Sequence, residues 1–339
     1  MMWRGLVGAA GAFLMMGFGG DGEGASAEAP ELTLPVACTI GVDCWPVVYF
    51  DRVASADAAD YRCGRLSYDG HTGTDFAVAD MAAVARGVPV VASAPGVVRN
   101  VRDGMADIDV TTIGRDRLEG RDCGNGVAIT HDGDWETLYC HLRQDSIAVE
   151  PGDVVDAGDL LGLVGMSGYA SFPHVELTVM HNDQAIDPFT GSAEPATADA
   201  CDVGPGPLWT TTALAAMPYR PVVVTKLGFA SERPEWLDVK RGAHSATNVP
   251  IEAPVFIVYV EGYALSAGDQ LEIVVRDPQG AVFHQQTFDE PRDQARFFRF
   301  TGRRLAGGQL QQGRYTASLR WRDSDGALLA EHEGTALVE

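Results

Sequence analysis

The stretch GNGVAITHDGDWETLYCHL, residues 124–142, indicates the fold class of the part of the chain around it. Its two halves are rich in Val, Ile, Thr, Trp and Tyr, which favour β-strands. Between them stands Asp132-Gly133-Asp134, a sequence typical of the turns that close β-hairpins. The stretch therefore predicts two antiparallel strands joined by a tight turn.

Similar patterns surround this hairpin from about residue 63 to residue 192. VPVVASAPGVVRNV (88–101), DVVDAGDLLGLVG (153–165) and HVELTVM (174–180) are short apolar runs separated by glycine-containing turns, and each is typical of a strand. Residues 103–122 interrupt the pattern as a long polar segment, of a length typical of functional or mobile loops. This half of the chain is predicted to be a β domain.

Strand patterns return after the Gly/Pro-rich segment CDVGPGPLW, residues 201–209. Their regular spacing is typical of an antiparallel β-sandwich, and we expect an Ig-like one. The chain is thus predicted to be all-β. The predicted parts are a signal peptide (1–27), an extended arm (28–62), a first β domain (63–200), a linker (201–218) and a C-terminal β-sandwich (219–339).

The N-terminus has the features of a secretory signal. A short positive region is followed by an apolar stretch over residues 5–20 and by the small-residue cleavage site Ala25-Ser26-Ala27. The apolar stretch is shorter than the roughly 20 residues that a membrane-spanning helix needs. We therefore expect export to the periplasm or the cell exterior, without a membrane anchor, and a mature chain that begins near Glu28.

Charge and cysteine content narrow the possible partners and the compartment. The 339 residues carry a formal net charge of −22, so the chain should repel nucleic acid and anionic membranes. Six cysteines in an exported chain favour disulfides over metal ligation, since no CxxC pair is present. We expect Cys38 and Cys44 to fasten the arm to the segments that follow it. The other four are Cys63, Cys123, Cys140 and Cys201.

Four short segments of the first β domain carry its candidate polar groups. HTGTD provides His71 and Asp75, YCHL provides His141, PHVEL provides His174 and Glu176, and AIDPF provides Asp187, which is interpreted as a turn former. Side chains at i and i+2 of a strand point to the same face, so His174 and Glu176 should face one common point. His131, at a hairpin end, and His181, at an odd offset from His174, are interpreted as structural residues.

The order and context of these segments resemble the M23 zinc metallopeptidases of the lysostaphin or LytM type, which cleave cell-wall peptide bridges. The resemblance covers about residues 66 to 190, from DGHTGTDFAV through YCHL and VEPGDVVDAGDLLGLVGMSG to FPHVELTV and DPF. It implies an antiparallel LytM/lysostaphin-type sheet with a metal on the floor of a groove. It also implies His71 and Asp75 as zinc ligands and His141 and His174 as catalytic residues.

Glu176 departs from the family pattern, in which the last motif is HxH and the second His is the third ligand. A carboxylate can ligate Zn²⁺ at about the same distance as imidazole, which would keep three protein ligands and an open position. Two carboxylates would lower the Lewis acidity of the metal and favour a harder ion such as Mn²⁺. Alternatively, the metal is lost and the domain is a binding module, or Glu176 is a solvated strand residue.

The resemblance implies a secreted or periplasmic zinc metalloendopeptidase that hydrolyses peptide cross-links of peptidoglycan, with one Zn²⁺ per chain. The alternative is an inactive M23-like protein that binds peptidoglycan or regulates a cell-wall amidase. In either case the C-terminal sandwich would position the first domain, on the wall or against a cell-wall or divisome protein.

Overall fold

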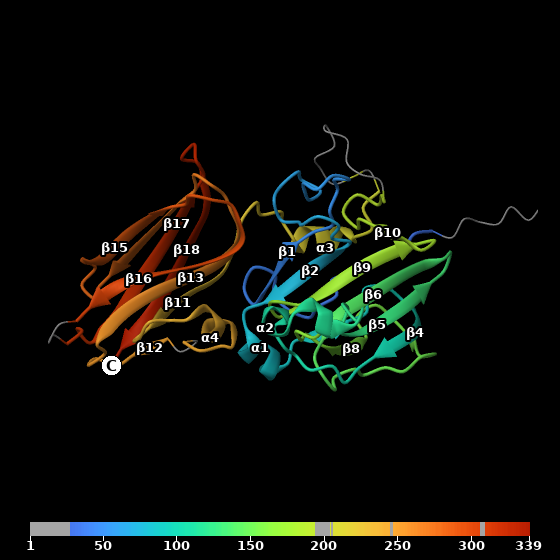
Figure 1. Cartoon of the computed structure of the whole chain (residues 1–339), viewed down its shortest axis with the longest axis horizontal. Coiled ribbons are helices and arrows are strands. Elements are labelled where there is room, and N and C mark those ends of the chain that lie inside the picture. The colour runs from blue at the N-terminus through green and yellow to red at the C-terminus, as the bar shows by residue number, and fades with distance from the viewer. Residues whose placement is uncertain (1–27, 194–203, 205, 245–246, 306–308) are drawn as a thin grey trace, which may run out of the picture.

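A computed structural model of the chain describes residues 28–193, 204, 206–244, 247–305 and 309–339. The predicted signal peptide and Cys201 lie outside these residues. The described chain forms two antiparallel β domains that lie side by side, with the later one drawn in orange and red (Figure 1). The predicted all-β class is confirmed, and the few helices are short.

The first domain is built on an eight-stranded sheet in the order β1-β2-β9-β6-β5-β4-β7, with β10 paired to β9. Strands β5 and β6 form the predicted hairpin around the Asp-Gly-Asp turn. The strands of the sheet are β1 (Cys44–Val48), β2 (Gly73–Val78), β4 (Gly96–Arg102), β5 (Asn125–His131), β6 (Trp135–Leu142), β7 (Val154–Val155), β9 (His174–His181) and β10 (Gln184–Ile186).

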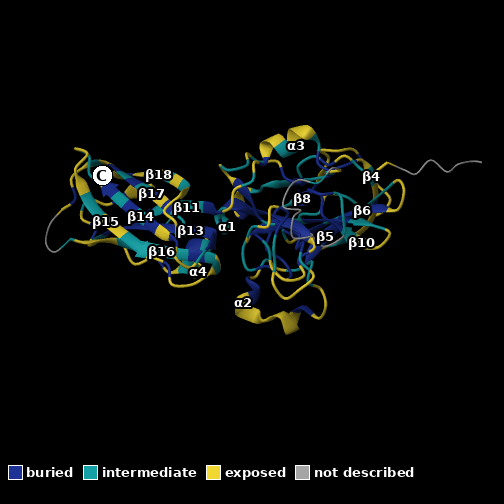
Figure 2. Ribbon diagram, turned by 90° about the horizontal axis from the view of Figure 1, so that it is seen from above, coloured by how far each residue is buried: buried dark blue, intermediate teal, exposed yellow. Residues whose placement is uncertain are grey.

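Shorter elements surround this sheet. A second, two-stranded sheet pairs β3 with β8, and the long polar segment contains α2 and the 3₁₀-helix η1. Figure 2 shows α2 as a largely exposed projection. The bounds of these elements are β3 (Pro89–Val91), β8 (Leu160–Leu163), α1 (Met81–Arg86), α2 (Val110–Ile113), η1 (Arg115–Leu118) and α3 (Thr211–Ala216).

The N-terminal arm is joined to the first domain by strand pairing. Strand β1 pairs with β2 and forms the edge of the main sheet. Cys38 and Cys44 are bonded to each other, so the expectation that they fasten the arm to later segments was wrong. A second disulfide joins Cys123 to Cys140, and Cys63 is also disulfide-bonded. The predicted preference for disulfides is confirmed for the described cysteines.

The C-terminal domain contains two antiparallel sheets. One has the order β11-β13-β16 and the other β12-β18-β17-β14-β15, in which only the short β12 pairs in parallel. Large buried side chains such as Phe256, Tyr315 and Trp321 belong to one apolar cluster with residues of both sheets. The two sheets therefore share a core, while an Ig-like topology stays a prediction. The bounds are β11 (Val223–Ala230), α4 (Trp236–Lys240), β12 (Asn248–Val249), β13 (Val255–Leu265), β14 (Gln270–Arg276), β15 (Val282–Asp289), β16 (Gln294–Arg304), β17 (Gly313–Arg322) and β18 (Leu328–Val338).

Lysine ion pairs hold the two domains together. The sequence contains two lysines, Lys226 and Lys240, and both belong to the C-terminal domain. Lys226 Nζ lies 2.5 Å from Asp80, whose other carboxylate oxygen caps α1, and Lys240 pairs with Asp109, which caps α2. All four side chains are largely buried. The ion pairs thus join the C-terminal domain to two helix starts of the first domain.

Apolar packing continues across the same boundary. Val223, Tyr263 and Ala264 of the C-terminal domain belong to the buried cluster that forms the core of the first domain. Because apolar burial contributes about 25 cal/mol per Å², this shared packing stabilises one relative placement of the two domains. Within the described residues, no helix is both long and apolar enough to cross a membrane.

Candidate active site

Three neighbouring strands bring the predicted site residues together. His71 lies two residues before β2 and Asp75 lies within it. His174 and Glu176 lie on β9, and His141 lies near the end of β6. Because β9 pairs with both β2 and β6, these residues converge near the middle of the main sheet. Asp75 and Glu176 are directly opposite each other in the β2–β9 register.

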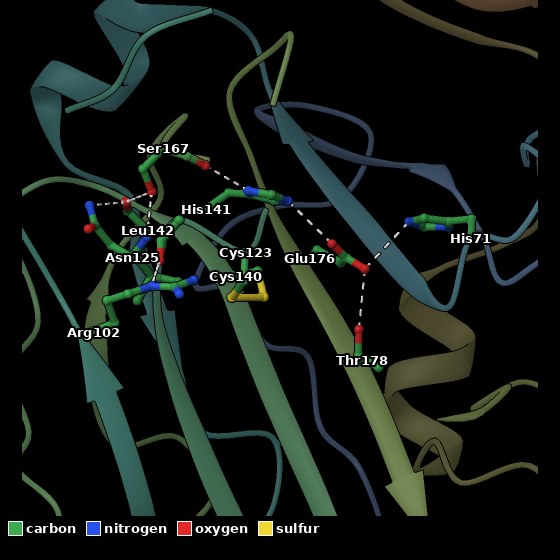
Figure 3. The surroundings of a disulfide bond; sticks show 11 residues. His71, Arg102, Cys123, Asn125, Cys140, His141, Leu142, Ser167, Glu176 and Thr178 are labelled. Carbon is green, nitrogen blue, oxygen red and sulfur yellow. Dashed lines mark hydrogen bonds and ion pairs between the residues drawn. A yellow bond between two sulfur atoms is a disulfide. The ribbon is translucent and has the colours of Figure 1, made fainter. Parts of the chain in front are cut away.

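The two carboxylates lie among three imidazole Nε2 atoms. His71 Nε2 is 3.2 Å from Asp75 Oδ1 and 3.7 Å from Glu176 Oε1. His141 Nε2 is 3.2 Å from Glu176 Oε2, and His174 Nε2 is 3.6 Å from Asp75 Oδ2. Figure 3 shows Glu176 between His141 and His71. Only 18% of the Glu176 side chain is exposed, so Glu176 is not a freely solvated strand residue.

Each of the three histidines is oriented by a backbone carbonyl. Nδ1 of His71 lies 2.9 Å from Tyr49 O, that of His141 lies 2.7 Å from Ser167 O, and that of His174 lies 2.8 Å from Phe172 O. A carbonyl oxygen can only accept, so Nδ1 donates its proton in all three contacts. The Nε2 atoms are thereby directed at the carboxylates, as in metal sites whose ligands are fixed by a further hydrogen bond.

The position of His141 depends on an irregular backbone at the end of β6. Its φ is +65°, in the left-handed region that few non-glycine residues occupy and where histidine is enriched. The preceding residue, Cys140, is disulfide-bonded to Cys123, whose carbonyl accepts a hydrogen bond from the His141 amide at 2.8 Å. The disulfide therefore braces the bend that directs His141 toward Glu176.

Removing this disulfide should lower stability. Cys123 and Cys140 are 17 residues apart, and freeing a loop of that length is expected to reduce the free energy of unfolding by about 3 kcal/mol. The double serine variant at these positions, compared with the parent protein by urea unfolding, measures the loss. A matched control is the double serine variant of Cys38 and Cys44, whose six-residue separation predicts a loss of about 2 kcal/mol. An unchanged unfolding curve for the first variant would contradict this expectation.

Gly73 leaves room for the Glu176 side chain. A Cβ atom at position 73 would lie 2.6 Å from both Cγ and Oε1 of Glu176, much closer than van der Waals contact. The glycine of the HTGTD segment, on β2, is thus needed because any side chain there would clash with Glu176 on the neighbouring strand β9. A larger side chain there would displace Glu176 from the position in which it faces His71.

The electrostatics of the site centre on its two carboxylates. Burial alone would lower the pKa of His71, but Asp75 and Glu176 outweigh it and raise this pKa to about 9. Burial also opposes the protonation of His141, but Glu176 outweighs it and raises the His141 pKa. The Glu176 pKa would be raised by burial, but the histidines, His141 above all, lower it to about 2. Burial lowers the pKa of His174 to about 4. Positive charge is therefore favoured beside the paired carboxylates.

This donor set fits a divalent metal ion. One ligand atom each from His71, Asp75 and Glu176 lie within 4.8 Å of one another. The separations of 3.2 and 3.7 Å from His71 Nε2 to the two carboxylates are close to the roughly 3.4 Å between ligands of a tetrahedral Zn²⁺ at about 2.1 Å. Like charges directly opposite on neighbouring strands destabilise a sheet, and a cation between Asp75 and Glu176 would remove that repulsion.

A groove of about 320 Å³ opens onto Asp75, His141, His174 and Glu176. Sequence reasoning did not identify several residues of its walls, among them Tyr68, Tyr169, Tyr263 and Arg296. Tyr263 and Arg296 belong to the C-terminal domain, so the groove is built by both domains. Val110 and Thr111 of the long polar segment also line it. No side-chain motif in the sequence marks Tyr263 and Arg296, because their place in the groove depends on how the two domains pack.

The histidines interpreted as structural have partners away from the carboxylates. His131 Nδ1 lies 2.7 Å from Pro95 O, and its Nε2 lies 2.9 Å from the Thr137 hydroxyl. The His181 ring stacks on Trp135 with the ring centres 4.2 Å apart. Both residues therefore lie at the end of the hairpin and not among the convergent Nε2 atoms.

Residues 69–188 match the family model of peptidase family M23, and the resemblance predicted from the motifs is confirmed over this part of the chain. The chain is 35% identical over 120 residues to the DD-carboxypeptidase/endopeptidase Mpg of Neisseria meningitidis serogroup B. The aligned residues are 35% of this chain and 22% of that protein. It is 29% identical over 117 residues to the peptidoglycan DD-endopeptidase ShyB of Vibrio cholerae serotype O1. Here the aligned residues are 34% of this chain and 22% of that protein. The chain thus spans about a fifth of the length of these relatives.

Solved structures with a similar domain include the catalytic domain of the antimicrobial peptidase lysostaphin from Staphylococcus simulans. The match has 26% identity and a TM-score of 0.26, and it covers 35% of this chain and 76% of that one. The catalytic domain of the prophage-encoded M23 protein EnpA from Enterococcus faecalis matches at 22% identity and a TM-score of 0.31, over 50% of this chain and 97% of that one.

Proposed function

We propose that this chain, which carries a peptidase family M23 domain over residues 69–188, is an exported zinc metalloendopeptidase that hydrolyses peptide cross-links of peptidoglycan. The observation that carries the proposal is the buried pair of opposed carboxylates, Asp75 and Glu176, among three imidazole Nε2 atoms. The open groove beside this pair and the names of the two relatives above support the substrate class.

His71, Asp75 and Glu176 would hold one metal ion per chain. Bound there, Zn²⁺ would supply Lewis-acid activation of the scissile carbonyl and of water. Glu176 stands where the family has a histidine, so two carboxylates instead of one would offset the charge of the ion. Mn²⁺, a harder ion, is the second choice for such a set.

His141 and His174 would act on protons at their Nε2 atoms. Both rings donate Nδ1–H to a carbonyl, so Nε2 is the nitrogen of each that faces the groove. In the neutral ring, Nε2 of His174 can accept a proton from the attacking water. Nε2 of His141, when the ring is protonated, can donate to the oxyanion that develops on the peptide carbonyl.

Export and further partners belong to the same proposal. The disulfides at Cys38–Cys44 and Cys123–Cys140 suit an oxidising compartment, either the periplasm or the cell exterior. The predicted N-terminal signal sequence would direct the chain there and then be removed. The C-terminal domain would also offer a surface to a cell-wall or divisome protein.

The decisive test is hydrolysis of purified cell walls by the full mature chain. We expect cross-linked muropeptides to be converted to uncrosslinked products, with the activity abolished by a chelator and restored by Zn²⁺. Chromatography of the released fragments measures the reaction. Walls left intact by a metal-loaded, folded protein would contradict the proposal.

Glu176 favours one second candidate, an inactive M23-like protein that binds peptidoglycan or regulates a cell-wall amidase. A carboxylate that has replaced a ligand histidine is the change expected if the metal had been lost. Cosedimentation with purified walls, together with no hydrolysis and no metal, would favour this candidate.

A further inference from the structure

We propose that Arg296, in the C-terminal domain, is a positioning residue for His174, so that the second domain completes the active site of the first. The catalytic consequence rests on the proposed function, while the effect on the His174 ring does not. Arg296 lies on β16 and lines the wall of the groove. Its own contacts reach the segment that leads into His174.

That segment is Ser171-Phe172, and both of its residues contact the C-terminal domain. Arg296 Nη1 donates to Ser171 O at 3.2 Å, and Lys240 Nζ donates to the same carbonyl at 3.4 Å. Arg296 Cζ lies 5.2 Å from the centre of the Phe172 ring, within the range of cation–π attraction. Two cationic side chains of one domain thereby fix a short backbone segment of the other.

Phe172 in turn contacts His174 in two ways. Its carbonyl accepts the Nδ1–H of His174, which sets the orientation of the imidazole. Its ring stacks on the His174 ring, with centres 4.3 Å apart and planes inclined by 22°. A shift of Phe172 would therefore move the Nε2 atom of His174 relative to Asp75.

Arg296 is itself held rigidly enough to transmit this constraint. Its Nη2 pairs with Glu261, a buried carboxylate on β13 that also accepts a hydrogen bond from Trp236 Nε1 at 2.9 Å. Tyr263 lies directly opposite Arg296 on β13, with its ring centre 5.6 Å from Cζ. The planar guanidinium binds Ser171 O through Nη1 and Glu261 through Nη2 and lies over the Phe172 ring, and the single nitrogen of a lysine at this position would not reproduce that spacing of donors.

The test compares Arg296→Met with a matched arginine on the same strand. Arg299 also pairs with a buried carboxylate, Glu290, but it is not among the residues that line the groove. With a cross-linked muropeptide dimer as substrate, we expect Arg296→Met to lower kcat by about ten- to hundredfold, as for a small displacement of a catalytic group. KM and metal content should stay unchanged, and Arg299→Met should retain the parental kcat.

A second readout requires neither activity nor metal. The stacked Phe172 ring shields the ring protons of His174, and their NMR signals in the metal-free protein can be assigned by their loss in His174→Gln. Replacing Arg296 with Met should shift these signals toward the positions that they take in the Phe172→Leu variant. Arg299→Met should leave them in place.

The outcomes separate this proposal from the proposed function. If the parent protein fails to cleave walls but Arg296→Met alone moves the His174 signals, the positioning role stands and the peptidase assignment fails. If Arg296→Met leaves both the His174 signals and kcat at their parental values, the positioning role is overturned. A change confined to a higher KM would also overturn it, because that result would indicate direct contact between Arg296 and the substrate. If Arg296→Met does not fold, Arg296→Lys keeps a charge opposite Glu261 and should show the same loss of kcat and the same shifts. A parental kcat and unmoved signals in that variant would overturn the role.

Discussion

Replacing Glu176 with alanine is expected to yield a folded protein without bound metal, whereas the parent chain should hold about one Zn²⁺. Glu176 offers one of three convergent atoms that could bind a metal ion, and its carboxylate faces His71 across 3.7 Å. Two remaining protein ligands, His71 and Asp75, are fewer than the three that catalytic zinc sites use. Elemental analysis of the mature chain, purified without added metal or chelator, measures the difference.

Two further variants make this result specific. Glu136→Ala removes a carboxylate from the neighbouring strand β6, where Glu136 pairs with Arg99, and it should retain the metal. Glu176→His restores the histidine that is the third metal ligand in the family pattern, and this variant should also bind zinc. If the parent protein takes up no zinc even on incubation while Glu176→His does, the site was inactivated at this residue, and the regulatory candidate would gain support.

His141→Ala and His174→Ala are each expected to lower hydrolysis by about 10²- to 10⁴-fold, the range found for general acid–base groups. Neither residue is among the three proposed metal ligands, so metal content should stay near one per chain. The loss should appear in kcat, because the Nε2 atoms act on the reacting groups and not on distant parts of the substrate. Steady-state cleavage of a muropeptide dimer measures it.

A histidine on the same strand serves as the control for this pair. His181 ends β9 and stacks on Trp135, away from the carboxylates, so His181→Ala should keep the parental rate. Full activity in either His141→Ala or His174→Ala would overturn its catalytic role. A loss of metal in one of them would instead place that histidine among the ligands.

The strands of the first domain could be predicted from the sequence because their signals are local. The β5–β6 hairpin follows from strand-favouring residues around an Asp-Gly-Asp turn. The convergence of His174 and Glu176 follows from the two-residue period of a strand. The HTGTD and YCHL segments could be joined to them only through the family resemblance, since no local rule places β2 and β6 on either side of β9. The roles of these residues stay predictions.

Other parts of the site depend on contacts that a sequence does not encode locally. The carbonyls of Tyr49, Ser167 and Phe172 orient the histidines, and a backbone carbonyl carries no residue-type signal. The steric role of Gly73 appears only once Glu176 lies opposite it. Arg296 reaches the groove only because the two domains are docked.

The two lysines have a consequence for chemical labelling. Lys226 and Lys240 carry the only ε-amino groups of the sequence, and both are enclosed in ion pairs between the domains. Amine-acylating reagents need an accessible amine, and both ε-amino groups are largely buried while Asp80 and Asp109 are engaged. Apart from the α-amino group, acylation of this protein therefore measures how often its domains separate. Apart from these two lysines, the Lys and Arg positions of the sequence are all arginines, whose guanidinium groups these reagents leave untouched.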